Sequence, residues 1–144
     1  MAVIERARSP LRPAEIARLL RRAGDCVGAW EGEVGILFTG DAEIRRLNRT
    51  FRGKDRPTDV LAFPDGRAEI TFPARLGDIA VSIPGAGRNA RRAGHSLRRE
   101  VSVLLVHGFL HLAGYDHEVD GGEMSDLEAD LHRRLLPKSR SGRG

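Results

Sequence analysis

The sequence His107-Gly-Phe-Leu-His111-Leu-Ala-Gly114-Tyr-Asp-His117 decides how this chain is organised. It closes an apolar run, Val101 to Leu112, that is long enough for a helix. Residues four apart on a helix share a face, so His107 and His111 can direct both imidazoles at one ion. Gly114 tolerates left-handed backbone angles, so it can end the helix and let the chain return with His117 as a third ligand.

This spacing predicts a metal site with an open coordination position. Closed structural zinc sites normally use four ligands rich in cysteine, whereas three protein ligands leave room for a water whose pKa the metal lowers to about 7. Cys26 is the only cysteine, which excludes a cysteine-based zinc cluster and an internal disulfide. We expect one Zn²⁺ per chain, although imidazoles also accept other divalent transition metals. The remaining histidines, His95 and His132, are interpreted as ordinary surface or partly buried residues.

Length and composition indicate one domain. The chain has 144 residues, 40% of them hydrophobic, which is enough for one sizeable core over residues 1–137. Residues 138–144 are expected to form a disordered basic tail. The sequence shows neither the long apolar run of a membrane span nor the apolar region of a secretory signal, so we expect a cytoplasmic protein.

The basic residues are almost all arginine, and the formal net charge is +4. Arginine binds phosphate oxygens bidentately and stacks on bases, so arginine clusters favour a polyanionic partner. Solvated helix faces are the alternative interpretation of the same composition. One cluster comprises Arg45, Arg46, Arg49 and Arg52, and the other comprises Arg88, Arg91, Arg92, Arg98 and Arg99.

The apolar periodicity predicts an α+β fold: a single compact domain with a small mixed sheet packed against helices and a central apolar metal-bearing helix. The histidine spacing on that helix makes the expected domain zincin-like. Strands are expected at Val34–Thr39, Asp59–Phe63, Glu69–Phe72 and Leu76–Ile83. Helices are expected at Leu11–Ala23 with Gly24 as the stop, at 41–51 with Asp41 as the cap, at Pro84–Ala93, at Leu97–Leu112 with Ser96 as the cap, and around Met124, Leu127, Leu131 and Leu135.

The histidine spacing is shared with the metzincin proteases, including the glycine. Those enzymes carry a glutamate directly after the first histidine as the general base, and this chain has Gly108 there. Glycine cannot accept a proton. The pattern therefore favours a related scaffold that acts on another substrate, such as a phosphodiester, over a protease.

Three blocks of the sequence resemble the YbeY family of bacterial endoribonucleases, also described as rRNA maturation factors. The blocks are His107–His117, Leu47–Pro64 (LNRTFRGKDRPTDVLAFP) and Leu76–Ile79 (LGDI). They occur in the family's order with similar separations, so the resemblance spans about Val34 to Leu135. The N-terminal thirty residues and the tail match only in general character.

The resemblance implies zinc ligation by His107, His111 and His117, the same side chains that the spacing indicates. It assigns the family's functionally important arginine to Arg52, whose fixed charge would stabilise the scissile phosphate. Without the resemblance, Arg52 reads as a surface arginine at a helix C-terminus. The implied function is a single-strand-preferring endoribonuclease of rRNA maturation (16S rRNA 3′ end processing) and ribosome quality control, with metal-bound water as nucleophile. The implied partners are rRNA precursors and the ribosomal small subunit, and neither DNA nor a membrane is expected.

A noncatalytic ribosome-assembly factor is the alternative, in which a metal stabilises the last third of the fold and the basic faces bind RNA. The sequence supplies no evident general base, and turnover of RNA distinguishes the two functions. Structural roles are expected for Asp59 and Asp78, and Asp116 is interpreted as an exposed turn residue.

Overall fold

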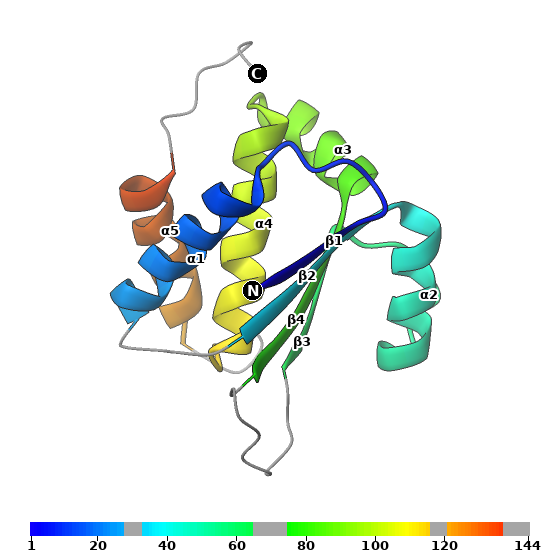
Figure 1. Cartoon of the computed structure of the whole chain (residues 1–144), viewed down its shortest axis with the longest axis horizontal. Helices are drawn as coiled ribbons and strands as arrows, with labels where there is room; N and C mark the ends of the chain where they lie inside the picture. The colour runs from blue at the N-terminus through cyan, green and yellow to red at the C-terminus, as the bar shows by residue number, and fades with distance from the viewer. Residues whose placement is uncertain (28–32, 65–74, 116–120, 137–144) are drawn as a thin grey trace.

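The strands form a mixed sheet in the order β1-β2-β4-β3 (Figure 1). They are β1 (Ala2–Glu5), β2 (Glu33–Thr39), β3 (Val60–Pro64) and β4 (Arg75–Ser82). β1, β2 and β4 run parallel, and β3 pairs antiparallel with β4 at the edge. The computed structural model describes residues 1–27, 33–64, 75–115 and 121–136.

The helices are α1 (Pro13–Val27), α2 (Asp41–Arg52), α3 (Ile83–Ala93), α4 (Leu97–Leu112) and α5 (Glu123–Leu135). α1, α4 and α5 lie on one side of the sheet, α2 lies on the other, and α3 connects β4 to α4 (Figure 1). This arrangement confirms the predicted α+β domain with a small mixed sheet. None of the helices in the described ranges combines the length and apolar composition that crossing a bilayer requires.

Alternation along β2 explains why both faces of the sheet are covered. Val34, Ile36 and Phe38 are buried in the main core, beneath α1 and α4. Leu37 points the opposite way and packs with Ile44 of α2 in a smaller core. Successive side chains of a strand point to opposite faces, so β2 contributes to two separate apolar layers. The smaller layer leaves part of its face uncovered.

α4 has the bounds that its sequence predicts. Ser96 Oγ accepts a hydrogen bond from the Arg99 amide at 3.0 Å and so caps the helix. Buried side chains occur around most of its circumference, including Val101, Leu105 and Phe109. A helix of this kind is packed on several sides, so α4 is the central element of the main core.

Two local expectations were wrong, and one strand was missed. Gly24 does not stop α1, because it lies on the buried face of the helix and the helix continues to Val27. Asp41 is the first residue of α2 and not its cap; Gly40 is the cap residue. β1 was not predicted, because an edge strand of four residues carries too little pattern. The expected strand at 69–72 falls outside the described residues.

Gly77 allows β3 and β4 to pair closely. Its φ is +148°, and a Cβ atom there would lie 2.3 Å from the carbonyl oxygen of Phe63 and 2.9 Å from Leu112 Cδ2. Only glycine lets the two strands and the end of α4 approach so closely. Close packing therefore explains why the Leu76–Ile79 block has glycine at position 77.

Asp41 ties the start of α2 to the start of α3. Its carboxylate accepts two hydrogen bonds from the Arg88 guanidinium, at 2.9 and 3.0 Å, and one from Ser82 Oγ at 2.7 Å. The buried Ser82 hydroxyl in turn accepts from the Gly85 amide at 3.0 Å and caps α3. The hydrogen bonds from Arg88, and then that from Ser82, hold the pKa of Asp41 below its usual range despite partial burial.

Asp41→Asn is expected to lower the free energy of unfolding by about 1 kcal/mol at pH 7, a modest value because the ion pair is partly exposed. The pKa of Asp41 is lowered by folding, so its stabilisation is present above the ordinary value of 3.8 and is lost as the pH falls through the folded value. Urea unfolding of both proteins at pH 7 and below pH 3.8 measures this. A difference that grows in acid would contradict the assignment.

Candidate functional site

His107 and His111 lie one turn apart on α4 with their ring nitrogens turned toward each other. The two Nε2 atoms are 3.2 Å apart, and the ring centroids are 4.7 Å apart. Two nitrogens bound to one tetrahedral zinc at about 2.0–2.1 Å would lie about 3.3 Å from each other, so these side chains fit a shared ion. Both rings are partly exposed, which leaves the pair open to solvent.

Glu128 of α5 supports this pair from behind. Its Oε1 atom is 3.0 Å from His107 Nδ1, and its side chain is only 14% exposed. A carboxylate on the outer nitrogen fixes the orientation of an imidazole, keeps the proton on that nitrogen and leaves Nε2 as the electron-pair donor. The sequence prediction missed Glu128. The sequence does carry a signal for it. Glu128 is four residues after Met124 and three before Leu131, so it lies on the buried face of α5.

The third predicted ligand, His117, lies outside the described residues, as does Asp116. Within the described ranges, no three His, Cys, Asp or Glu side chains are placed to hold a metal ion. Gly114 adopts φ +100° directly after α4, and the Tyr115 amide donates to the Leu110 carbonyl at 3.0 Å. This is the left-handed helix end that the glycine predicts, and the three-ligand site stays a prediction.

Gly108 faces the sheet. A Cβ atom there would lie 2.8 Å from Ile79 Cγ2 of β4, because α4 packs tightly on the strand at this point. The position that carries the general base in metzincins is thus turned away from the Nε2 atoms of His107 and His111. Packing, and not only chemistry, accounts for the glycine after the first histidine.

The other two histidines do not belong to the facing pair. His95 Nε2 is 2.7 Å from Glu100 Oε1, and both side chains are almost buried. His132 is partly buried on α5, and the burial lowers its pKa. Both match the expectation of ordinary, partly buried residues.

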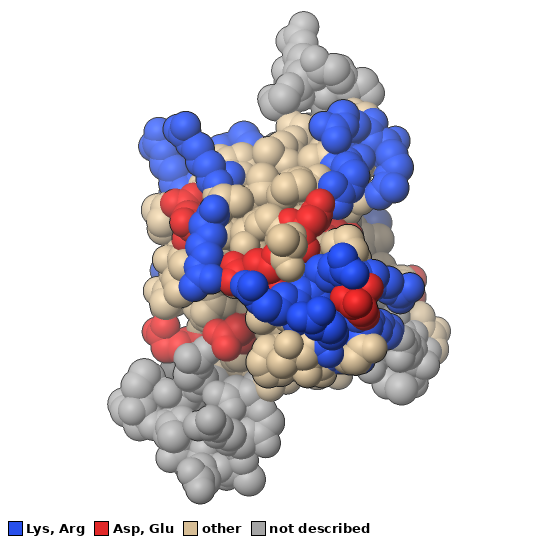
Figure 2. Space-filling view, turned by 90° about the vertical axis from the view of Figure 1, so that its right-hand side faces the viewer, with Lys and Arg blue, Asp and Glu red and all other residues tan. Residues whose placement is uncertain are grey.

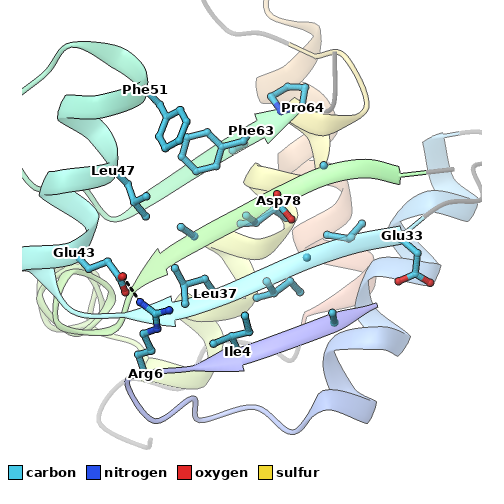
Figure 3. A pocket seen from close by; sticks show the side chains of 18 of the residues that line it. Ile4, Arg6, Glu33, Leu37, Glu43, Leu47, Phe51, Phe63, Pro64 and Asp78 are labelled. Atoms are coloured by element: carbon cyan, nitrogen blue, oxygen red, sulfur yellow. Dashed lines mark hydrogen bonds and ion pairs between the residues drawn. The ribbon is translucent and has the colours of Figure 1, made fainter. Parts of the chain in front are cut away.

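A groove opens on the other face of the sheet, between α2 and the strands (Figure 3). Its volume is about 1130 Å³, which is large for a small-molecule pocket and suits a longer ligand. Leu37, Leu47 and Phe63 give it apolar walls, and Arg6 forms an ion pair with Glu43 at one end. The groove therefore combines apolar walls with charged side chains.

Arg52, the last residue of α2, lines this groove. α2 and α4 lie on opposite faces of the sheet, because Ala80 packs beneath α2 while its neighbours Ile79 and Val81 pack beneath α4. Both helices nevertheless end at the same end of the sheet (Figure 1). The structure thus brings His107 and His111 together. Arg52 lies on the opposite face of the sheet, at the same end, beyond the edge formed by β3.

The two aspartates differ from each other. Asp59 accepts hydrogen bonds from the Val60 amide at 2.8 Å and from Asn89 Nδ2 at 2.9 Å, which agrees with a structural role. A structural role was also expected for Asp78, whose side chain is exposed on the floor of the groove (Figure 3). The reason is the register of β4, in which Asp78 points away from α4 and to the uncovered face.

Comparison with known proteins gives consistent similarities. The family model "Endoribonuclease YbeY" matches residues 12–135. Two proteins of that name are similar over most of their length: that of Solibacter usitatus is 49% identical over 90% of this chain and 84% of its own, and that of Koribacter versatilis is 43% identical over 96% and 88%. The solution structure of TM1509 from Thermotoga maritima superimposes with a TM-score of 0.65 at 27% identity and covers 99% of both chains.

Proposed function

We propose that this chain, which belongs to the YbeY family of endoribonucleases, cleaves single-stranded RNA with the help of a metal ion bound by His107, His111 and His117. The substrate class is ribosomal RNA precursors in the cytoplasm, including the 3′ end of 16S rRNA, and the partner is the small ribosomal subunit. The observation that carries the proposal is the pair of facing imidazoles, with Nε2 atoms 3.2 Å apart, in a chain of this family.

The donor set supports zinc, one ion per chain. Neutral imidazoles suit zinc and also nickel, copper or iron, and the carboxylate of Glu128 behind His107 is typical of zinc-binding histidines. When bound, such an ion supplies Lewis-acid chemistry that makes water nucleophilic near neutral pH. The protein's part is to orient the ring of His107 through Glu128, which leaves its Nε2 atom as the electron-pair donor.

Arg52 has the task of holding phosphate. Its guanidinium is permanently charged and offers a planar set of donors to phosphate oxygens. The RNA strand would pass from the groove around the end of β3 toward His111, with Arg52 stabilising negative charge on the phosphate that reacts. A phosphodiester also explains how hydrolysis can proceed where the metzincin glutamate is replaced by Gly108.

Arg52→Ala is expected to reduce kcat for RNA cleavage by about 10²- to 10³-fold, which is the usual effect of removing one donor from a developing negative charge. Arg52→Lys keeps the charge but loses the planar pair of donors, so its kcat should lie between that of the unaltered protein and that of Arg52→Ala. Initial rates on a structured rRNA precursor give kcat and KM separately. Arg21→Ala, an exposed arginine of α1, removes the same charge elsewhere and should change the rate less than about twofold.

A loss confined to KM would show that Arg52 only binds RNA, and that would contradict its catalytic assignment. The noncatalytic assembly factor makes a different prediction for the unaltered protein. It would bind precursor RNA stoichiometrically and leave it intact, so the absence of turnover by metal-loaded protein would favour that alternative.

A further inference from the structure

Phe51 is the most exposed large hydrophobic side chain in the described part of the chain, at 65%. It lies one residue before Arg52, near the end of α2, and lines the groove. A single exposed apolar side chain needs no explanation on its own. The ring of Phe51, however, is held in place by a second aromatic ring and is surrounded by basic side chains.

A second aromatic ring holds Phe51 in place. The rings of Phe51 and Phe63 have centroids 5.3 Å apart and an interplanar angle of 61°, an edge-to-face arrangement. Phe63 belongs to β3 and packs with Leu47 of α2 in the smaller core, so its position is fixed (Figure 3). The ring of Phe51 is therefore supported on one side by the core and open to solvent over most of its surface.

The segment around Phe51 is strongly basic. Residues 45–56 contain six arginine or lysine side chains and one carboxylate, that of Asp55. Asp55 pairs with Arg45 at 2.8 Å and approaches Arg49 to 3.9 Å, and both arginines stay more than half exposed. Figure 2 shows basic side chains gathered on the face that α2 presents to solvent. Glu43 also pairs with Arg46 at 3.3 Å, but two carboxylates cannot neutralise six basic side chains, so the cluster attracts polyanions.

Among the described residues, the groove beside α2 has no such excess of basic side chains. Asp78 is exposed on its floor, Glu33 pairs with the N-terminal ammonium, and Glu43 pairs with Arg6 and Arg46. The basic side chains of α2 therefore attract phosphate more strongly than the groove does. A nucleic-acid strand would consequently keep its phosphates along α2 and turn its bases toward the apolar wall of the groove.

We propose that Phe51, supported by Phe63 and flanked by Arg49 and Arg52, is a stacking platform for one unpaired nucleobase of the RNA whose phosphates contact α2. The inference rests on the proposed RNA substrate and adds a base-binding subsite to it. Stacking on an aromatic ring requires a base with a free face, which a duplex does not offer. The platform thus gives a physical basis for a preference for single strands, with little dependence on base identity.

Phe51→Leu is the informative variant, because it keeps an apolar side chain of similar size but removes the flat ring. Binding of a fluorescently labelled single-stranded oligouridine is measured by anisotropy at fixed salt, and a gel confirms that the RNA stays intact. Loss of one stacked base should weaken binding by about 5- to 150-fold. Phe51→Trp should bind at least as tightly as the unaltered protein.

A matched probe separates stacking from charge. An abasic oligonucleotide with the same number of phosphates should bind the unaltered protein and Phe51→Leu equally, since only the phosphate contacts remain. Ala14→Leu is the control variant, because Ala14 is exposed on α1, which lies on the opposite face of the sheet from α2. It should leave the binding of oligouridine unchanged.

Equal binding of oligouridine by Phe51→Leu and the unaltered protein would overturn the platform and leave the endoribonuclease proposal standing. The groove would then be a candidate for a protein partner. Conversely, Phe51-dependent binding by a protein that never cleaves RNA would support the platform and refute the enzymatic function. An equal loss with the abasic probe would also overturn the platform, because it would reveal a general defect in binding.

Discussion

His107→Ala should lose at least about 10³-fold in RNA cleavage and should retain less than one metal ion per chain after dialysis. The substitution removes one nitrogen of the facing pair and leaves Glu128 without the imidazole that it orients. Two remaining histidines cannot maintain the geometry that a three-ligand site requires. Elemental analysis of purified protein measures the metal, and initial rates measure cleavage.

The supporting role of Glu128 gives a graded version of this test. Glu128→Gln keeps a hydrogen-bond acceptor beside His107 Nδ1 but removes the charge, so metal affinity should fall by about 10- to 100-fold. Circular dichroism must show that both variants keep the native fold. Undiminished cleavage by folded His107→Ala, or full metal retention, would refute histidine ligation at this position.

Gly108→Glu is expected to prevent folding. The position faces Ile79 on the strand, where even a Cβ atom would lie 2.8 Å from a methyl group. A glutamate would have to push α4 off the sheet or bury an unpaired carboxylate, and each costs several kcal/mol. The variant should therefore be insoluble or lack a cooperative thermal transition, and it should not gain protease activity.

Gly108→Ala is the milder form, which allows a quantitative measurement. Overpacking by one methyl group costs about 1–3 kcal/mol, and the better helix propensity of alanine returns about 1 kcal/mol. The net loss should disappear when Ile79 is also shortened to alanine, because the added methyl then fills space that the shorter side chain leaves. A double-mutant cycle of urea unfolding tests this coupling. A fully native thermal transition for Gly108→Glu would show that α4 can move away from β4 at no cost.

The part of the site that the sequence predicts well is the part made by local geometry. His107 and His111 face each other because any two residues four apart on a helix do so, and the apolar run around them sets the bounds of α4. Ser96 caps the start of α4 and Gly114 ends it, as predicted, because both act through the backbone of neighbouring residues. Apolar periodicity and helix-capping residues depend only on contacts within one segment of the chain.

The remainder depends on contacts between segments far apart in the chain. Glu128 reaches His107 only because α5 packs on α4. Asp41 becomes a partner of Arg88 instead of a cap, since the start of α3 comes within reach. The separation of Arg52 from the histidines by the sheet follows from strand order, which no local pattern encodes.

The order of the elements also has a consequence during protein synthesis. His107 lies on α4, but the carboxylate that orients its ring comes from α5, the last helix of the described chain. While the nascent chain still has α5 inside the exit tunnel of the ribosome, the imidazole of His107 lacks this support. The histidine of a hydrolase built in this order is oriented only after α5 has left the tunnel and packed on α4.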